Sequence, residues 1–355
     1  MESRIKSVIT EIHPIDRTLV AAGQAHLDSL TKPQGSLGRL EELALQLFLI
    51  NGGKAPVSDP CRIYTIAGDH GVVAEGVSAS PQAVTRQMVF NFLNNGAGVN
   101  ALASTAGAGL CVVDAGVCGE DFPDHPALVR NKIAQGTANL VKGPAMTREQ
   151  CLAALQLGMQ LADTSHADGI RTLGTGEMGI GNTTPSTALY CAYLDLDPKV
   201  VSGPGAGAPP EMVERKAAVV SAGLQANREA IVSGDAIDIL AALGGLEIAA
   251  LTGLILKGAH NRQVVCVDGF ISTAAFVAAW RMNPAVVDYC VLSHASAEPG
   301  HTKALQSVGL KPLLHLDMRL GEGTGAACAM FLLRAAAAMY NQMATYEQAG
   351  VSTND

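Results

Sequence analysis

Short runs of β-branched and aliphatic residues, each ending at a glycine or a small polar loop, alternate with alanine-rich segments from about residue 59 onward. The runs are continuously apolar rather than alternating with polar residues, which indicates strands buried on both faces. Such strands, separated by helices, are typical of a parallel sheet covered by helices. The pattern therefore predicts an α/β fold with a parallel, Rossmann-like sheet. The runs begin at Arg62, Cys111, Arg171, Val200, Val264, Tyr289 and Leu313.

Helices are expected between these runs, at residues 147–162, 209–232, 247–256 and 325–340. Residues 1 to about 58 are also typical of helices. There Pro33 and Gly35 interrupt a helix, and Ser36 is placed to cap a new one that starts at Leu37.

The composition limits the possible partners. Charged residues make up only 16% of the chain, against roughly 25% in a typical soluble domain, and burial in a homo-oligomer would explain the deficit. The longest apolar stretches are shorter than the ~18 residues of a membrane span, and the start of the chain has no apolar signal-peptide core. We therefore expect a cytoplasmic protein. A net charge of −8 without a lysine or arginine cluster argues against nucleic acid as a partner.

No metal site is predicted. The eight cysteines are scattered without a CxxC pair, mostly within apolar runs, which favours buried free thiols over disulfides or zinc ligands. The nine histidines form no HExxH motif.

GTGEMGIGNTTPS, Gly174 to Ser186, follows a predicted strand and contains a GxGxxG pattern. A dinucleotide site, and thus an NAD(P)-dependent oxidoreductase, is one interpretation. However, the loop continues to Thr184, the expected helix cap, and Glu177 would bring a carboxylate toward a pyrophosphate. A cradle for one phosphate and a ribose fits better, with Glu177 accepting from ribose hydroxyls. A merely tight glycine turn is the plain alternative.

GPGAGAPPEMVERK, Gly203 to Lys216, repeats this pattern of strand end, glycine turn and proline-initiated helix. Lys216 is either a phosphate ligand or an ordinary solvated lysine. The segment Gly68 to Met88 carries Asp69 and His70, whose roles stay open between catalysis and structure. Ser80 precedes Pro81, so a helix cap is its plain interpretation.

RLGEGTGAA places Glu322 between two glycines, after the run LLHLDM, which we expect to be a buried strand. Thr324 is the expected cap of the final long helix. Because the carboxyl ends of parallel strands form the ligand edge of such sheets, Glu322 is a candidate for the active site.

These motifs together resemble a known family. KPQGSLGRLE, GDHGV, SASPQAVT, GTGEMGIGNTTPS, GGLEIAALTG, DGFISTAA, SHASAE and RLGEGTGAA, in this order from Lys32 to Met339, resemble the nicotinate-nucleotide:dimethylbenzimidazole phosphoribosyltransferases of cobalamin biosynthesis. The resemblance implies a large α/β domain at residues 59–325, a small helical domain formed by residues 1–58 and 326–355, and a homodimer.

The resemblance also implies roles for individual residues. Glu322 matches the catalytic base, Glu177 and Lys216 match contacts to nicotinate mononucleotide, and Ser80 lies near the base pocket. One departure from the family pattern concerns the pocket for the acceptor base. A glutamine is expected one position after Gln87, where this chain has Met88. The full set of expected substrate-binding residues is Ser80, Gln87, Met88, Gly176, Glu177, Met178, Gly179, Asn182, Thr183, Gly203, Gly205, Lys216, Leu320 and Gly321.

The chemistry of this reaction agrees with the residues. Nicotinate leaves as a neutral pyridine nitrogen from a cationic ring, so its departure requires neither an acid nor a metal, and no cofactor is expected. One ionised carboxylate, Glu322, suffices to take the N–H proton of the incoming azole. The preferred acceptor stays open, and a catalytically silent nucleotide-binding protein is a third possibility beside the transferase and the oxidoreductase.

Overall fold

The computed structural model describes residues 1–205 and 209–352. Residues 206–208, within the predicted glycine turn before Lys216, and residues 353–355, at the end of the predicted small domain, lie outside the described residues.

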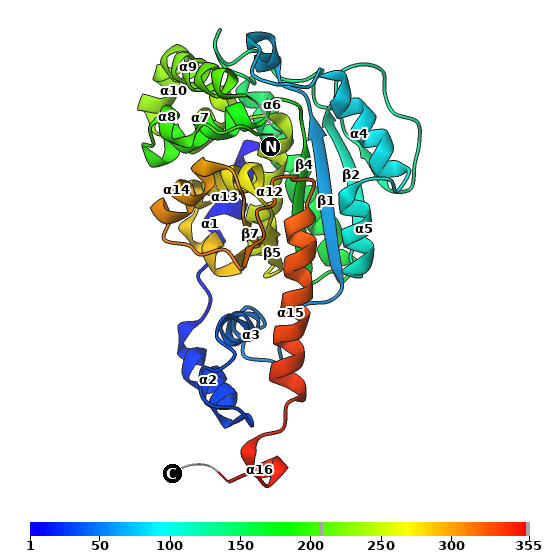
Figure 1. Ribbon diagram of the computed structural model, residues 1–355, viewed down its shortest axis with the longest axis vertical. Helices are drawn as coiled ribbons and strands as arrows, with labels where there is room; N and C mark the ends of the chain where they lie inside the picture. The colour runs from blue at the N-terminus through cyan, green and yellow to red at the C-terminus, as the bar shows by residue number, and fades with distance from the viewer. Residues whose placement is uncertain (206–208, 353–355) are drawn as a thin grey trace.

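The described residues form a six-stranded sheet in the order β3-β2-β1-β4-β5-β6, in which every strand pair is parallel (Figure 1). The predicted α/β class is confirmed. From β1 the chain adds strands on one side, and from β4 on the other, so the strand order reverses between β1 and β4. Ligands of open α/β sheets bind outside the carboxyl ends of the strands at such a point. The strands are β1 (Cys61–Gly68), β2 (Gly109–Gly116), β3 (Leu128–Arg130), β4 (Thr172–Met178), β5 (Val264–Val267) and β6 (Cys290–Leu292), with β7 (His294–Ala295) and β8 (Leu314–His315) in a separate pair.

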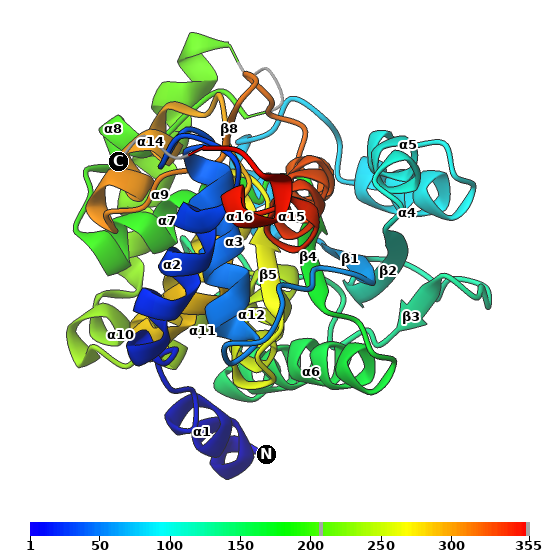
Figure 2. The same cartoon turned by 90° about the horizontal axis from the view of Figure 1, so that it is seen from below.

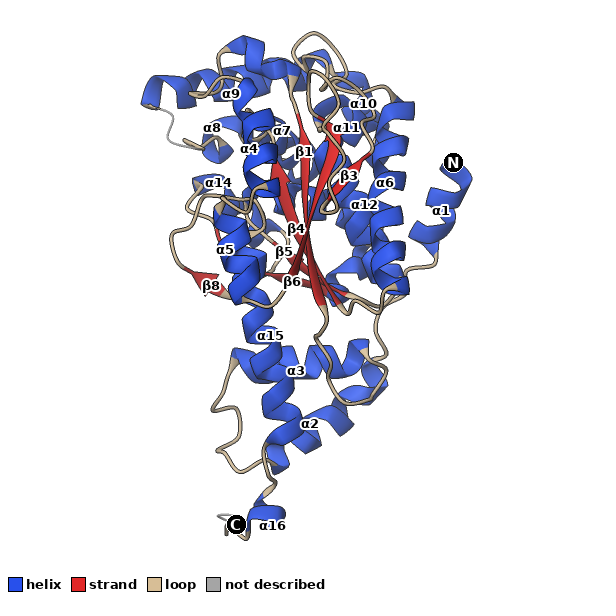
Figure 3. Ribbon diagram, turned by 90° about the vertical axis from the view of Figure 1, so that its right-hand side faces the viewer, coloured by secondary structure: helices blue, strands red, loops and turns tan. Residues whose placement is uncertain are grey.

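Helices cover both faces of the sheet, with α4, α5 and α15 on one side and α6 and α12 on the other (Figure 3). The helices are α1 (Glu2–Thr10), α2 (Val20–Ser29), α3 (Arg39–Ile50), α4 (Ala83–Leu93), α5 (Gly98–Thr105), α6 (Arg148–Ala167), α7 (Thr183–Leu194), α8 (Pro198–Val201), α9 (Pro210–Ala226), α10 (Arg228–Ser233), α11 (Ala236–Leu243), α12 (Leu246–His260), α13 (Phe270–Met282), α14 (Pro299–Ser307), α15 (Thr324–Gln342) and α16 (Tyr346–Ala349). Short 3-10 helices lie at Arg17–Leu19, Gly71–Glu75 and Pro284–Tyr289.

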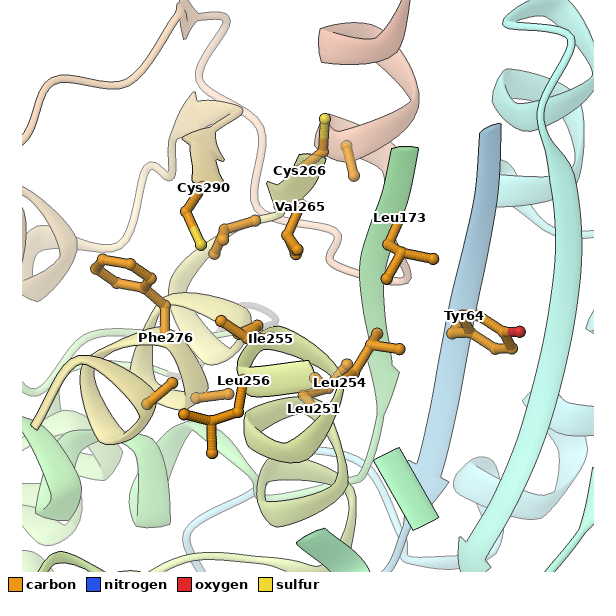
Figure 4. Packing of buried hydrophobic residues seen from close by; sticks show 14 of the residues in the cluster. Tyr64, Leu173, Leu251, Leu254, Ile255, Leu256, Val265, Cys266, Phe276 and Cys290 are labelled. Carbon is orange, nitrogen blue, oxygen red and sulfur yellow. The ribbon is translucent and has the colours of Figure 1, made fainter. Parts of the chain in front are cut away.

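The core lies between the sheet and α12, where Leu173 and Val265 meet Leu251, Leu254 and Ile255 (Figure 4). These side chains are fully buried, which stabilises the fold by about 1.5 to 3 kcal/mol for each. All eight cysteines are free thiols, and five of them are buried.

Two glycines allow α6 and α12 to pack in close contact. A Cβ at Gly158 would lie 1.7 Å from the Ala250 carbonyl oxygen, and one at Gly253 would lie 2.0 Å from that of Leu155. An alanine at either position would therefore push the two helices apart.

The two ends of the chain meet below the sheet. Helices α2 and α3 pack together, and α3 also contacts α15, whose first half covers the sheet (Figure 2). Here His26 Nε2 lies 2.8 Å from the Tyr340 carbonyl oxygen, and the Thr31 amide donates to Ala344 at 3.0 Å. Helix α1 instead contacts α6 and α12. The division into residues 1–58, 59–325 and 326–355 stays a prediction.

Several local predictions were wrong. The run at Val200 is helix α8, because Asp197 caps the Lys199 amide and Pro198 starts a helix. The run LLHLDM contains only the two-residue strand β8 and leaves Leu316 55% exposed, so it is not a buried strand of the main sheet. Short apolar runs do not distinguish strand from helix or loop.

The predicted helix caps were also wrong. Helix α3 begins at Arg39 with Gly38 as its cap instead of Ser36, and α7 begins at Thr183, one residue before the predicted cap. Helix α4 begins at Ala83, so Ser80 lies outside its first turn. Thr324 is the first residue of α15 and not its cap.

Within the described ranges, none of the helices has both the length and the apolar character needed to cross a bilayer.

Candidate active site

A pocket opens beyond the carboxyl ends of the strands, next to the point where the strand order reverses. Strand β1 runs upward in Figure 1, so this edge is the upper one. The wall of the pocket comes from segments far apart in the sequence. It includes residues 77–80 after β1, 177–183 from the end of β4 to the start of α7, residues 204–205, Lys216 of α9, residues 269–271 at the start of α13, three side chains between 294 and 298, and residues 319–321.

Glu177 lies in this wall as the next-to-last residue of β4, and only 6% of it is exposed. The Asn182 side-chain amide donates to its Oε2 at 2.5 Å. Burial raises the pKa of the Glu177 carboxyl from 4.5 to about 8, and the nearby acids Asp268, Glu247 and Glu322 add to the increase. Near neutral pH the protonated form of this group is therefore favoured, and it can both donate to and accept from a hydroxyl.

Lys216 supplies a buried cation to the wall of the pocket. Its Nζ donates to Thr183 Oγ1 at 3.3 Å and to the Gly203 carbonyl oxygen at 3.2 Å, and only 5% of the residue is exposed. Burial lowers the pKa of Lys216, and the charge of Glu298 opposes this. A buried ammonium group is stabilised by an anionic partner, and a bound phosphate would supply one.

Glu298 is the acid that faces Lys216. Only 4% of it is exposed. Burial raises the pKa of the Glu298 carboxyl, while the nearby Gly205 backbone amide, as a hydrogen-bond donor, opposes the increase. Arg319 lies close by and donates to the Gly205 carbonyl oxygen at 3.2 Å. The pocket thus presents Lys216 and Arg319 to an anion, and Glu298 to a hydrogen-bond donor.

Glu322 lies on the far side of the loop formed by residues 319–321. Its backbone is left-handed, with a φ of 65°, and only 4% of the residue is exposed. The Val99 amide, in the first turn of α5, donates to its Oε2 at 3.3 Å. Burial raises the pKa of the Glu322 carboxyl, while the Val99 hydrogen bond opposes the increase. The result is a carboxylate of increased basicity directly after residues 319–321, although Glu322, the predicted base, is not itself among the pocket-lining residues.

Most of the predicted site residues lie together. Those that line the pocket are Ser80, Glu177, Met178, Gly179, Asn182, Thr183, Gly205, Lys216, Leu320 and Gly321. Gly176 and Gly203 lie behind its wall: a Cβ would be 2.2 Å from the Glu322 carbonyl oxygen in the first case and 2.2 Å from Glu298 Oε2 in the second. Gln87 is exposed on α4 and Met88 is half-buried there, and neither is among the pocket-lining residues.

Asp69 and His70 lie beneath the pocket wall. Asp69 accepts from the Cys118 amide at 2.7 Å, and His70 Nε2 lies 2.5 Å from Glu247 Oε1. A Cβ at Gly179 would lie 3.1 Å from both His70 Nε2 and Glu247 Oε1. The buried pair of His70 and Glu247 therefore lies against the segment that follows β4, and the roles of Asp69 and His70 stay open between catalysis and structure.

Polar side chains at the site that the sequence analysis missed include Asp268, His294, Ser296, Glu298 and Arg319. Asp268 directly follows β5 and precedes a glycine, the same pattern that identified the other loops. His294 and Ser296 line the pocket just beyond β6. Their run, YCVLSH, was interpreted only as a strand, although its polar end is typical of a ligand edge.

The GxGxxG glycines do not open toward a dinucleotide. Gly174 and Gly176 lie within β4 and face α15, since a Cβ at Gly174 would be 2.9 Å from Met330 Cε and one at Gly176 would meet the Glu322 backbone. The glycines serve close packing between the strand and α15. Among the described residues, no group of three or more His, Cys, Asp or Glu side chains is arranged to hold a metal ion.

Taken together, the parallel sheet and the pocket at its carboxyl edge define an α/β protein with a small-molecule site. The wall of that site contains a buried lysine, Lys216, and two buried glutamates, Glu177 and Glu298.

The chain belongs to the phosphoribosyltransferase family, whose model matches residues 12–351. It is 61% identical over 354 residues to a nicotinate-nucleotide–dimethylbenzimidazole phosphoribosyltransferase of Oleidesulfovibrio alaskensis, covering 99% of each chain. It is 58% identical over 356 residues to an enzyme of the same name from Nitratidesulfovibrio vulgaris strain DP4, covering 100% of each. The crystal structure of CobT from Thermus thermophilus matches with a TM-score of 0.89 and 44% identity, over 95% of this chain and 100% of that one.

These matches confirm the resemblance inferred from the motifs. The protein is an enzyme of the phosphoribosyltransferase class. They support the transferase interpretation and not the oxidoreductase alternative.

Proposed function

We propose that this enzyme transfers the phosphoribosyl group of nicotinate mononucleotide to 5,6-dimethylbenzimidazole, which gives α-ribazole 5′-phosphate and nicotinate. The full-length similarity to proteins named for this reaction carries the proposal. The buried Glu322 carboxylate beside a pocket that contains Lys216 supports it independently.

The pocket suits the nucleotide. Lys216 and Arg319 would bind its phosphate, because a buried lysine and an exposed arginine both present their cations to the pocket. Glu177, whose raised pKa favours the protonated form, would share hydrogen bonds with the ribose hydroxyls. Thr183 starts helix α7 in the same wall, so its amide and the positive end of the helix also face an anion.

The acceptor position lies next to Glu322. A Cβ on Gly98 would lie 2.8 Å from Leu320 Cδ2 and 3.6 Å from Glu322 Oε2, so the side chains of Leu320 and Glu322 both lie against Gly98 at the start of α5. We propose that the flat acceptor ring lies there, against Leu320 and Met178, with its N–H directed at Glu322.

The reaction then needs one proton transfer from the protein. The unprotonated nitrogen of the azole forms a bond to C1′ while the bond from C1′ to the pyridinium nitrogen breaks, and its electron pair neutralises the nicotinate ring. The N–H proton of the azole passes to Glu322. Because the azole attacks from the face opposite the leaving group, the β-nucleotide becomes an α-riboside.

We further propose a homodimer in the cytoplasm. Phe331 of α15 is 64% exposed and Leu320 is 59% exposed, and contact with a second copy would cover such side chains. Eight free thiols fit a reducing compartment. Light scattering after size exclusion measures the oligomeric state directly.

The test incubates the protein with nicotinate mononucleotide and a panel of azoles, purines and phenols, and identifies the products by mass. Glu322→Gln is expected to lower kcat by about 10² to 10⁴ with little change in nucleotide affinity. Glu149→Gln, at an exposed position of α6, is the matched control and should behave like the wild type. Nucleotide binding without nicotinate release would instead identify a silent binding protein, and near-normal turnover in Glu322→Gln would exclude Glu322 as the base.

A further inference from the structure

Asp268 connects the end of β5 to the start of α15. The residue is 1% exposed. Its Oδ2 accepts from the Gly323 amide at 3.0 Å, and its Oδ1 accepts from the amides of Gly325 at 2.7 Å and Ala326 at 3.1 Å. The first amides of a helix have no partner within it, so this one carboxylate caps α15 from a distant part of the chain.

The peptide that joins Glu322 to Gly323 is held on both sides. Its N–H donates to Asp268, and its carbonyl oxygen accepts from Thr65 Oγ1 at 2.7 Å. Gly176 leaves room for it, since a Cβ there would lie 2.2 Å from the same carbonyl oxygen. Strands β1, β4 and β5 each contribute one of these contacts, so the position of the peptide is set by the sheet.

This restraint matters because Glu322 has an unfavourable backbone. A left-handed conformation with a φ of 65° in a residue other than glycine costs about 1 to 2 kcal/mol. Without the hydrogen bonds to the next peptide, Glu322 would relax to a common conformation, and its carboxylate would turn away from the Val99 amide at the start of α5.

We infer that Asp268 is a positioning residue that holds the Glu322–Gly323 peptide in place, so that the Glu322 carboxylate faces the acceptor. The inference rests on the proposed function. In it Asp268 affects the reaction through Glu322, the proposed base, and does not contact the substrate. This role accounts for a buried acid at the site that does not line the pocket.

The local charges agree with this role. Three amides and the positive end of α15 surround the Asp268 carboxylate, and His294 Nε2 lies 3.7 Å from its Oδ1. The negative charge of Asp268 in turn adds to the increase in the pKa of Glu322. A neutral side chain at this position therefore loses a hydrogen-bond acceptor and weakens the base.

The test compares Asp268→Asn with a matched control, Asp288→Asn. Asp288 is also a buried carboxylate that accepts from a backbone amide, that of Ile15, but it precedes β6 and so lies at the opposite edge of the sheet. Asp268→Asn is expected to lower kcat by about 10- to 100-fold while the KM for nicotinate mononucleotide stays within about twofold. Asp288→Asn should lower the melting temperature without this loss of kcat.

A double variant separates positioning from general destabilisation. If Asp268 acts through Glu322, Asp268→Asn should lower kcat by less than about twofold further when Glu322→Gln is already present. Additive losses in the double variant, or wild-type kcat in Asp268→Asn alone, would overturn the inference.

A crystal structure of Asp268→Asn tests the inference without any activity. We expect Glu322 to leave the left-handed conformation and its contact with the Val99 amide, and an unchanged Glu322 backbone would overturn the positioning role. Failure of the proposed function is distinct: the wild type itself would then release no nicotinate.

Discussion

The titration of Glu177 should lower the free energy of unfolding as the pH rises, and the substitution Glu177→Gln should remove this pH dependence. Its pKa of about 8 in the folded protein lies above the ordinary value of 4.5 for a glutamate, so folding favours its protonated form. Below pH 4.5 the carboxyl is protonated in both states and contributes no penalty. As the pH rises from 4.5 to about 8, the unfolded chain ionises while the folded protein holds the proton, and stability is lost.

The size of this loss follows from the two values. Integration of the titration between pH 5 and pH 7.5 gives about 3 kcal/mol of lost stability for the wild type. Glu177→Gln keeps the hydrogen bond from Asn182 but does not titrate. The difference in unfolding free energy between this variant and the wild type should therefore grow by about 3 kcal/mol over the same range, in favour of the variant.

Urea unfolding without substrate, followed by the fluorescence of the single tryptophan, measures this difference at each pH. Glu149→Gln removes a carboxylate from an exposed position and controls for the change in net charge. The unfolding free energy of Glu177→Gln relative to the wild type should increase between pH 5 and 7.5. A difference that stays constant or decreases would refute the assignment of a raised pKa to this carboxyl.

Other predictions address the substrates. Lys216→Ala should raise the KM for nicotinate mononucleotide far more than that for the phosphate-free riboside, and equal losses would show that Lys216 does not serve the phosphate. Gly98→Ala should raise the KM for the azole and leave that for the nucleotide nearly unchanged, because the new Cβ enters the space beside Leu320 and Glu322. The acid limb of kcat should lie above pH 4.5, since Glu322 acts ionised and its pKa is raised; a pH profile that stays flat down to 4.5 would contradict this. In competition assays benzimidazole should lose only ~1 to 3 kcal/mol in kcat/KM relative to the dimethyl compound, and near-absolute rejection would contradict an aliphatic pocket.

Local patterns in the sequence were enough to locate most of the pocket. Glu177 and Lys216 follow glycine-rich segments, and a pattern of this kind depends only on neighbours along the chain. The parallel sheet was predicted for the same reason, from buried runs separated by helices. Where a run was short, as at Val200, the helix signals of Asp197 and Pro198 outweighed its apolar character.

The supports of the site could not be predicted in the same way. Thr65 and Asp268 contact the Glu322–Gly323 peptide only because β1, β4 and β5 lie side by side, which requires the strand order. The cap of α15 likewise comes from Asp268 rather than from Thr324, its neighbour in sequence. Gln87 follows Ser80 by only seven positions, yet it is exposed on the surface of α4.

Helix α15 gives the site a mechanical property. Its 19 residues extend for about 28 Å from the neighbourhood of Glu322 to the contact with α3. A tilt of about 2° about its lower end would move the upper end by about 1 Å, which is enough to change the alignment of a catalytic group. The sheet and α5 hold the upper part of this helix, and we expect the contact with α3 at its far end to contribute to the same alignment. Substitutions at that distant contact should lower kcat before they affect substrate affinity.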